Sequence, residues 1–194
     1  AAAAGLRPVI ELMSISFSLV AFDQIVNMAA NLRYMSGGQI SVPMVIRAPT
    51  GAGVQLGATH SQSFETWLAE VPGMKVVCPS NSYDALGLIR SAIKDDNPVL
   101  VAEPALLYGA NGEVPDEYYE VEIGKASVTR TGTDITLVSY GYGMRVVSDA
   151  ADTLAERGVS AEVIDLRSLS PLDLDTVVTS VQKTNRVVVV DTAR

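Results

Sequence analysis

The chain has 194 residues, of which 48% are hydrophobic and 19% charged, and this balance predicts a folded globular protein rather than a disordered one. With 14 basic and 22 acidic side chains the formal net charge is −8, which repels phosphate backbones and argues against nucleic acid as a partner. No uncharged apolar run approaches the roughly 18 residues that a membrane-spanning helix needs, so we expect a soluble protein with no membrane partner.

The first half of the chain alternates apolar runs with helical patterns. Ala1 to Ala4 followed by Gly5 is typical of a helix end closed by glycine, so we infer that the chain is the middle part of a larger protein. The spacing of apolar residues over 17–35 predicts one helix whose buried stripe is Phe17, Ala21, Ile25, Met28 and Leu32. Around that helix we expect strands over 7–13, 42–47, 75–78 and 99–102, and helices over 62–70 and 82–94.

The second half repeats the alternation after a loop over 104–119 that is rich in glycine, proline and acidic residues. Strands are expected over 135–140 and 161–166, with a helix between them that Gly158 ends. Asp173 is expected to cap a helix that runs to about Lys183, and the run 186–191 is expected to form a buried strand.

Strict alternation of this kind predicts an α/β fold, in which mainly parallel sheets are covered by helices through right-handed crossovers. We expect two three-layer α/β/α lobes, over 1–110 and 124–194, joined by a linker over 111–123. Zinc and P-loop motifs are absent, and so is a GxSxG motif. The turn Gly141-Tyr142-Gly143 is more typical of tight strand-to-helix packing than of a dinucleotide site.

Two side chains carry possible reactivity. The only histidine, His60, follows a glycine-rich loop that leaves an expected strand, and in parallel sheets such loops bind ligands. Ser61 is expected to cap the helix that comes next, so the imidazole lies at a helix start. The only cysteine, Cys78, cannot form an internal disulfide, and its apolar setting predicts a buried, unreactive thiol in a reducing compartment.

Several long runs resemble a known family: FSLVAFDQIVN (17–27), RYMSGG (33–38), VPMVIRAPTG (42–51), THSQSFETWLAEVPGMKVVCPSN (59–81), GLIRSAIKDDNPVL (87–100) and EVIDLRSLSPLD (162–173). Together they are similar to the beta subunit of the thiamine-dependent first component of 2-oxo acid dehydrogenase complexes. The segments MSGG, LLYG, EVPDE and IGKA resemble the pyruvate dehydrogenase branch more than the branched-chain or acetoin branches. The resemblance implies a transketolase-like pyrimidine-binding lobe followed by an incomplete transketolase C-terminal-like lobe.

The resemblance also implies a heterotetramer of two alpha and two beta chains that works with a lipoyl acyltransferase. Thiamine diphosphate would lie at an alpha/beta interface, with its diphosphate and magnesium on the alpha chain and its aminopyrimidine on the beta chain. Phe17 corresponds to the aromatic residue that packs on the aminopyrimidine, and His60 to the active-site histidine of the family's HSQ motif, so we expect both side chains to line the same crevice. An imidazole there can give or accept a proton near neutral pH. We expect a bacterial cytoplasm, with a mitochondrial matrix or plastid stroma as alternatives.

A potassium site is implied as well. The family's ligands map to Met44, Ala92, Ile93, Asp95 and Asn97, mostly through backbone oxygens. Without the family, the segment 92–97 is equally consistent with an ordinary helix C-terminus with solvated acids.

One element of the family's chemistry is missing from the chain. The glutamate that activates the aminopyrimidine belongs upstream of Ala1, and Glu11 matches a different family position. We therefore expect the isolated polypeptide to be inactive. A catalytically inactive assembly fragment is the alternative function, and a single-chain thiamine enzyme such as a transketolase or deoxyxylulose-phosphate synthase is a weaker one.

Overall fold

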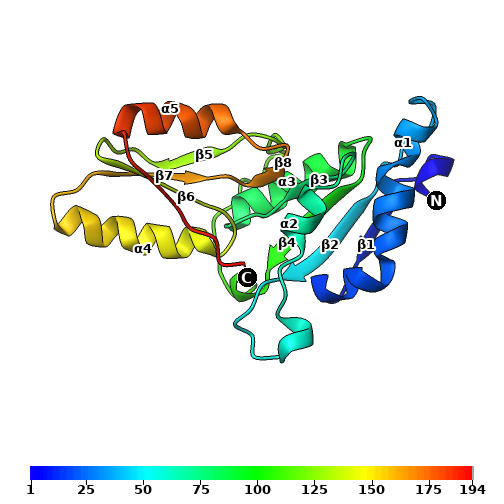
Figure 1. Ribbon diagram of the computed structural model, residues 1–194, viewed down its shortest axis with the longest axis horizontal. Coiled ribbons are helices and arrows are strands. Elements are labelled where there is room, and N and C mark those ends of the chain that lie inside the picture. Colours follow the sequence, from blue (N-terminus) through cyan, green and yellow to red (C-terminus); the bar gives the residue numbers. More distant parts are fainter. Residues whose placement is uncertain (194) are drawn as a thin grey trace.

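The computed structural model describes residues 1–193, and its strands form two sheets (Figure 1). The first sheet has the order β1 (Val9–Glu11), β2 (Val45–Thr50), β4 (Val99–Pro104), β3 (Lys75–Val77) and β8 (Ser168–Ser170). The second has the order β5 (Ser127–Arg130), β7 (Ala161–Asp165), β6 (Ile135–Ser139) and β9 (Val187–Val189). All neighbours are parallel except the pairs β3–β8 and β5–β7, which confirms an α/β fold with mainly parallel sheets.

Helices cover both faces of the first sheet. Because successive strand residues point to opposite faces, Val45 and Ile46 enter different cores. Val45 packs on the side of α3 (Ser82–Lys94), and Ile46 packs on the side of η2 (Ile15–Ala21), η3 (Gln24–Ala30) and α2 (Glu65–Ala69). Strand β2 thus supplies side chains to the cores on both faces of the sheet.

The second sheet lies between α4 (Gly143–Glu156) and α5 (Leu174–Thr184), which flank it on opposite sides in Figure 1. The α4 side is apolar, with Met144, Val147 and Ala151 buried against the sheet. The α5 side is joined by hydroxyl groups, since Thr136 Oγ1 lies 2.7 Å from both Ser180 Oγ and Thr184 Oγ1.

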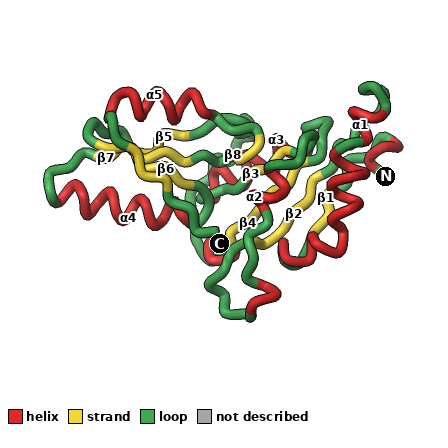
Figure 2. Tube along the Cα trace, viewed as in Figure 1, coloured by secondary structure: helices red, strands yellow, loops and turns green. Residues whose placement is uncertain are grey.

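The two lobes share backbone pairing. Strand β8 belongs to the second half of the chain but adds to the edge of the first sheet beside β3, as the strand tube in Figure 2 shows. The turn before β8 contributes Arg167, whose guanidinium forms an ion pair of 3.0 Å with the Asp84 carboxylate on α3. We did not expect β5 or β8 from the sequence. Because β8 pairs with β3, the lobes are connected by strand pairing as well as by the linker.

The single helix expected over 17–35 is wrong. The chain forms the 3-10 helix η2, bends by 70°, and continues as the π-helix η3 and the short helix α1 (Leu32–Met35). In a 3-10 helix residues three apart share a face, and Ile15 and Ser18 are buried; in the π-helix Ile25 and Ala30, five apart, are buried. The expected stripe therefore does not form, since Phe17 and Met28 are exposed.

Three further expectations need correction. The strand expected over 42–47 starts later, at Val45, and continues to Thr50. The helix expected over 62–70 is only Glu65–Ala69, and Ser61 does not cap it because its Oγ instead donates to the Gly57 carbonyl at 2.8 Å. The strand at 187–189 exists but is exposed, because it lies at the edge of the second sheet and no other described element covers its outer face.

The helices over 82–94, 143–156 and 174–184 agree with the sequence expectations, and so does the Asp173 cap, which accepts a hydrogen bond from Thr176 N at 3.2 Å. The short 3-10 helix Ala2–Ala4 ends at Gly5 with φ of 94°, as the alanine run predicts. Among the described residues, no continuous helix has the length and apolarity for a membrane crossing, although the bent pair Ile15–Ala21 and Gln24–Met35 meets that test when combined.

Candidate active site

The candidate site lies at the carboxyl edge of the first sheet, where β2 ends at Thr50. The chain then leaves the sheet as an exposed loop, visible at the bottom of Figure 1, and returns at α2. Near its far end the loop forms one turn of 3-10 helix, η4 (Ala58–His60), in which His60 is exposed. This is the edge at which loops of parallel sheets bind ligands.

The structure brings the two predicted site residues together. The ring centroids of Phe17 and His60 lie 5.2 Å apart with an interplanar angle of 85°, an edge-to-face contact. Phe17 is held in η2, whose first turn is capped by Ser14: its hydroxyl accepts from Ser16 N at 3.3 Å. The predicted juxtaposition of an aromatic ring and an imidazole is therefore present, and their catalytic roles stay predictions.

The imidazole has one polar neighbour. His60 Nδ1 lies 3.0 Å from Thr59 Oγ1, and within residues 1–193 no hydrogen-bond partner reaches Nε2. A ring that is exposed and free at one nitrogen can exchange a proton with a bound molecule.

Two serine hydroxyls beside Phe17 have no partner. The side-chain oxygens of Ser16 and Ser18 are buried, and neither forms a hydrogen bond with any residue that the structure describes. A buried hydroxyl without a partner is uncommon in folded proteins. Phe17 itself keeps 36% of its surface exposed, so its ring is available for stacking. An exposed aromatic surface of this kind fits a flat ring such as an aminopyrimidine, whereas the two buried hydroxyls are not accessible to a molecule stacked on it.

Glu65 is a buried acid that the sequence reading did not single out. It begins α2, is 3% exposed, and its carboxylate accepts a hydrogen bond from Thr50 Oγ1. Burial raises the pKa of the Glu65 carboxyl, whereas the hydrogen bond from Thr50 lowers it and leaves a net upward shift. In the sequence Glu65 is indistinguishable from an ordinary acidic residue in a first helical turn, because only the fold shows its burial.

Glu65 faces a cavity of about 270 Å³ between the lobes, lined also by Thr50, Cys78, Tyr140 and Tyr142. Cys78 is 1% exposed, which confirms the predicted burial, and that burial raises the pKa of its thiol. The turn at Gly141 is tightly packed as predicted, because a Cβ there would lie 2.7 Å from Cys78 Sγ. Its φ of 52° also favours glycine.

The residues of the predicted potassium site gather at the end of α3. The carbonyl oxygens of Ile93 and Asp95 both accept from Arg7 Nη1, at 3.1 and 2.9 Å. The Met44 carbonyl accepts from Val99 N at 2.9 Å, and Asn97 N donates to the Asp95 carboxylate at the same distance. Ala92 lies in the last turn of α3, where its carbonyl accepts from Asp95 N at 3.3 Å. The Arg7 guanidinium thus already occupies two of the predicted ligand carbonyls, and the potassium site stays a prediction.

Comparison with known proteins defines the class. Residues 1–110 match the family described as "Transketolase, pyrimidine binding domain", and residues 124–194 match "Transketolase, C-terminal domain". The chain therefore belongs to the transketolase family, with a pyrimidine-binding domain followed by C-terminal domain sequence.

Several similar curated proteins are beta subunits. The beta subunit of acetoin:2,6-dichlorophenolindophenol oxidoreductase of Cupriavidus necator is 51% identical over 193 residues, covering 100% of this chain and 57% of the relative. The pyruvate dehydrogenase E1 component subunit beta of Rhizobium meliloti is 48% identical over 192 residues, covering 98% of this chain and 42% of the relative. The chain thus spans about half the length of the curated relatives it matches.

A solved structure described as "Split gene transketolase, inactive beta4 tetramer" superposes with a TM-score of 0.78 at 25% identity, covering 97% of this chain and 58% of that one. The transketolase fold predicted from the sequence is therefore confirmed, together with the resemblance to E1 beta subunits.

Proposed function

We propose that this chain is part of the beta subunit of a thiamine-diphosphate-dependent 2-oxo acid dehydrogenase, which decarboxylates pyruvate and transfers the acetyl group to a lipoyl group. The observation that carries the proposal is the contact between Phe17 and His60, at 5.2 Å, on the carboxyl edge of a pyrimidine-binding domain. The beta-subunit relatives at 48% and 51% identity support the same assignment.

The chain's own residues would do two things in this reaction. The exposed ring of Phe17 offers a surface for stacking the aminopyrimidine. The free Nε2 of His60 can hold or move a proton at the reacting end of the substrate. When bound, thiamine diphosphate supplies the nucleophilic carbon and the electron sink for loss of carbon dioxide.

An alpha chain would complete the site with the diphosphate and magnesium contacts. Exposed apolar side chains on η2, η3 and α1 support a protein partner, since such side chains are often covered at interaction sites. The exposed ones are Leu19, Val20, Met28, Tyr34 and Met35. A second beta chain and the lipoyl acyltransferase belong to the same proposal, and so does a potassium ion at the end of α3.

A second candidate substrate has direct support. The Cupriavidus necator relative is named for acetoin, and its identity of 51% is as high as that of the pyruvate dehydrogenase relative. Acetoin is thus the alternative to pyruvate within the same class of enzyme.

The test is to co-purify the beta chain with its partner from its native source and to identify the partner by mass spectrometry. The complex is then assayed with thiamine diphosphate and magnesium, using 2,6-dichlorophenolindophenol as electron acceptor and either pyruvate or acetoin as substrate. We expect a distinct alpha chain and turnover with pyruvate. Absence of turnover with both substrates would refute the proposed function, and turnover with acetoin alone would transfer it to the second candidate.

The isolated 194-residue chain is expected to be inactive under the same assay. The similar split transketolase is described as an inactive tetramer of its beta chain, which supports this expectation. Thiamine-dependent product from the isolated chain would contradict it.

A further inference from the structure

The loop that carries His60 is closed at its base by two hydrogen bonds. Thr50 is the last residue of β2 and Glu65 the first residue of α2, and the hydroxyl of Thr50 donates to the carboxylate of Glu65. Both side chains are nearly inaccessible, at 5% and 3% exposed. Beside them Gly51 N donates to the Gln62 carbonyl at 3.3 Å. The two ends of the loop are thereby held together in a buried setting.

The rest of the loop has few contacts of its own. Residues 52–60 are all exposed, and the backbone turns through positive φ at Gly53, Gln55 and Gly57. The hydroxyl of Ser61 donates to the Gly57 carbonyl, and the His60 ring touches Phe17. A loop with so little internal support depends on its base for the position of its far end.

The hydrogen bond between Thr50 and Glu65 is not part of an ion pair, because among residues 1–193 no Lys, Arg or His side chain lines the cavity that Glu65 faces. The groups that face the same cavity are Cys78, Tyr140 and Tyr142, and Asp191 approaches through its hydrogen bond from the Tyr140 hydroxyl at 2.9 Å. None of these groups carries a positive charge, and Asp191 adds to the upward shift of the Glu65 pKa. A neutral amide of the same shape should therefore replace the Glu65 carboxyl well.

We propose that Glu65 is a positioning residue that, through its buried bond to Thr50, fixes α2 against the end of β2 and so holds the His60 imidazole on the Phe17 ring. A catalytic role for the His60 imidazole held in this way rests on the proposed function. The contact between His60 and Phe17 can be measured in this chain without its partner.

The single histidine makes the position directly measurable. In the uniformly labelled chain His60 gives one imidazole Cε1–H signal by NMR, and the adjacent Phe17 ring contributes a ring-current shift to it. A Phe17→Leu variant supplies the reference signal without that ring. We expect the signal of Glu65→Ala to move most of the way toward this reference. The signals of Glu65→Gln and of the control Glu70→Ala, an exposed acid at the end of the same helix, should stay at the native value.

Thr50→Val is a second variant, for use if Glu65→Ala fails to fold. It removes the hydroxyl that donates to Glu65 and nearly conserves the side-chain volume. Its His60 signal should also move toward the reference. If both variants fold and both keep the native His60 signal, the proposal is overturned. If only Thr50→Val folds, a native His60 signal in that variant overturns it.

Kinetic measurements on the complex with its alpha chain distinguish a failure of this inference from a failure of the proposed function. There Glu65→Ala should lower kcat by about 10- to 100-fold with KM nearly unchanged, and Glu65→Gln should restore it, because a misplaced group slows chemistry more than it weakens binding. Native kcat in Glu65→Ala would count against the positioning role. If the native complex shows no thiamine-dependent turnover at all, the proposed function fails, and the His60 signal still decides the position.

Discussion

Asp165 lies fully buried at the end of β7, where the two lobes meet. One carboxylate oxygen accepts from the Ser80 hydroxyl in the first lobe, and the other accepts from Arg167 N at 3.0 Å. Burial is the main cause that raises the pKa of Asp165 from 3.8 to about 6, and the nearby negative charge of Asp84 acts in the same direction. The folded protein therefore holds this proton more tightly than the unfolded chain does.

The sign of the pH dependence follows from this difference. Between about pH 4 and pH 6 the unfolded chain has lost the Asp165 proton and the folded protein has kept it. The stability that the protonated acid provides is complete below about pH 4 and is lost as the pH rises through about 6. The difference in pKa corresponds to about 3 kcal/mol in the free energy of unfolding at pH 8, and to about 1 kcal/mol at pH 4.5.

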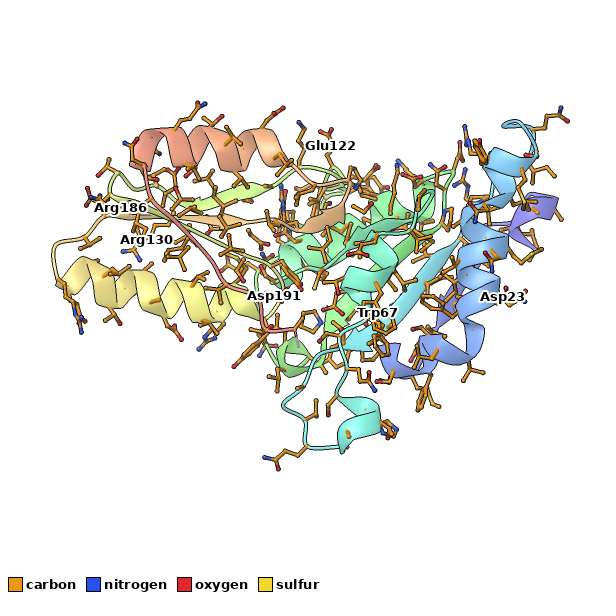
Figure 3. All side chains as sticks on the ribbon, viewed as in Figure 1. Asp23, Trp67, Glu122, Arg130, Arg186 and Asp191 are labelled. Carbon is orange, nitrogen blue, oxygen red and sulfur yellow. The ribbon has the colours of Figure 1, made fainter. Side chains whose placement is uncertain are left out.

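Asp165→Asn should recover most of that loss, because an asparagine mimics the protonated acid: its Oδ1 can accept from Arg167 N, and its amide N–H can donate to the Ser80 hydroxyl oxygen. We expect the variant to be more stable than the native chain by up to about 3 kcal/mol at pH 8 and by about 1 kcal/mol at pH 4.5. Urea unfolding at the two pH values measures this, followed by circular dichroism and by the fluorescence of the only tryptophan, Trp67, which projects from α2 and is labelled in Figure 3.

The control is Asp149→Asn, which changes a carboxylate whose side chain is 73% exposed and should show no such pH-dependent gain. If Asp165→Asn lowers stability at pH 8, or changes it equally at both pH values, the account of Asp165 as a buried acid that resists ionisation is wrong.

Three other predictions follow from single contacts. Arg167→Met should lower the free energy of unfolding by about 3–5 kcal/mol in the same urea assay, because it leaves the Asp84 carboxylate buried without its cation; a loss below about 1 kcal/mol would contradict this. Phe17→Ala should weaken thiamine diphosphate binding to the alpha–beta complex by about tenfold or more in a titration, while circular dichroism stays native, since the ring is 36% exposed; unchanged binding would remove Phe17 from the site. Arg7→Met removes a cation from the carbonyls at the end of α3, so potassium chloride should raise the melting temperature of this variant more than choline chloride does, and equal effects of the two salts would argue against a cation site there.

Much of the fold could be read from local sequence patterns. The helix over 82–94 was predicted with its observed bounds because its signals are local: Asn81 caps its first turn by accepting from Asp84 N at 2.8 Å, and apolar residues repeat at helical spacing. The parallel strands followed from short apolar runs between helices. The pairing of Phe17 with His60 was predicted from resemblance to a family, and the structure brings the two rings into contact.

The winding of residues 15–35 and the placement of β8 depended on contacts between distant parts of the chain. Local spacing predicts an α-helix over 17–35, but packing on the first sheet selects 3-10 and π turns, so that Ile15 and Ile25 are buried while Phe17 is left at the surface. Strand β8 is too short to be recognised by itself and exists because β3 offers it an edge.

The amino-acid sequence by itself determined the class of fold and the residues whose side chains could take part in binding or catalysis. Hydrophobic periodicity, helix caps and family motifs depend only on residues close together in the sequence. Only the tertiary structure decided which acid is buried, since Glu65 and Glu70 are five residues apart and differ only in what packs against them. Burial, charge state and the distance between two rings depend on residues far apart in the chain, so they emerge only when the sheets and helices are assembled.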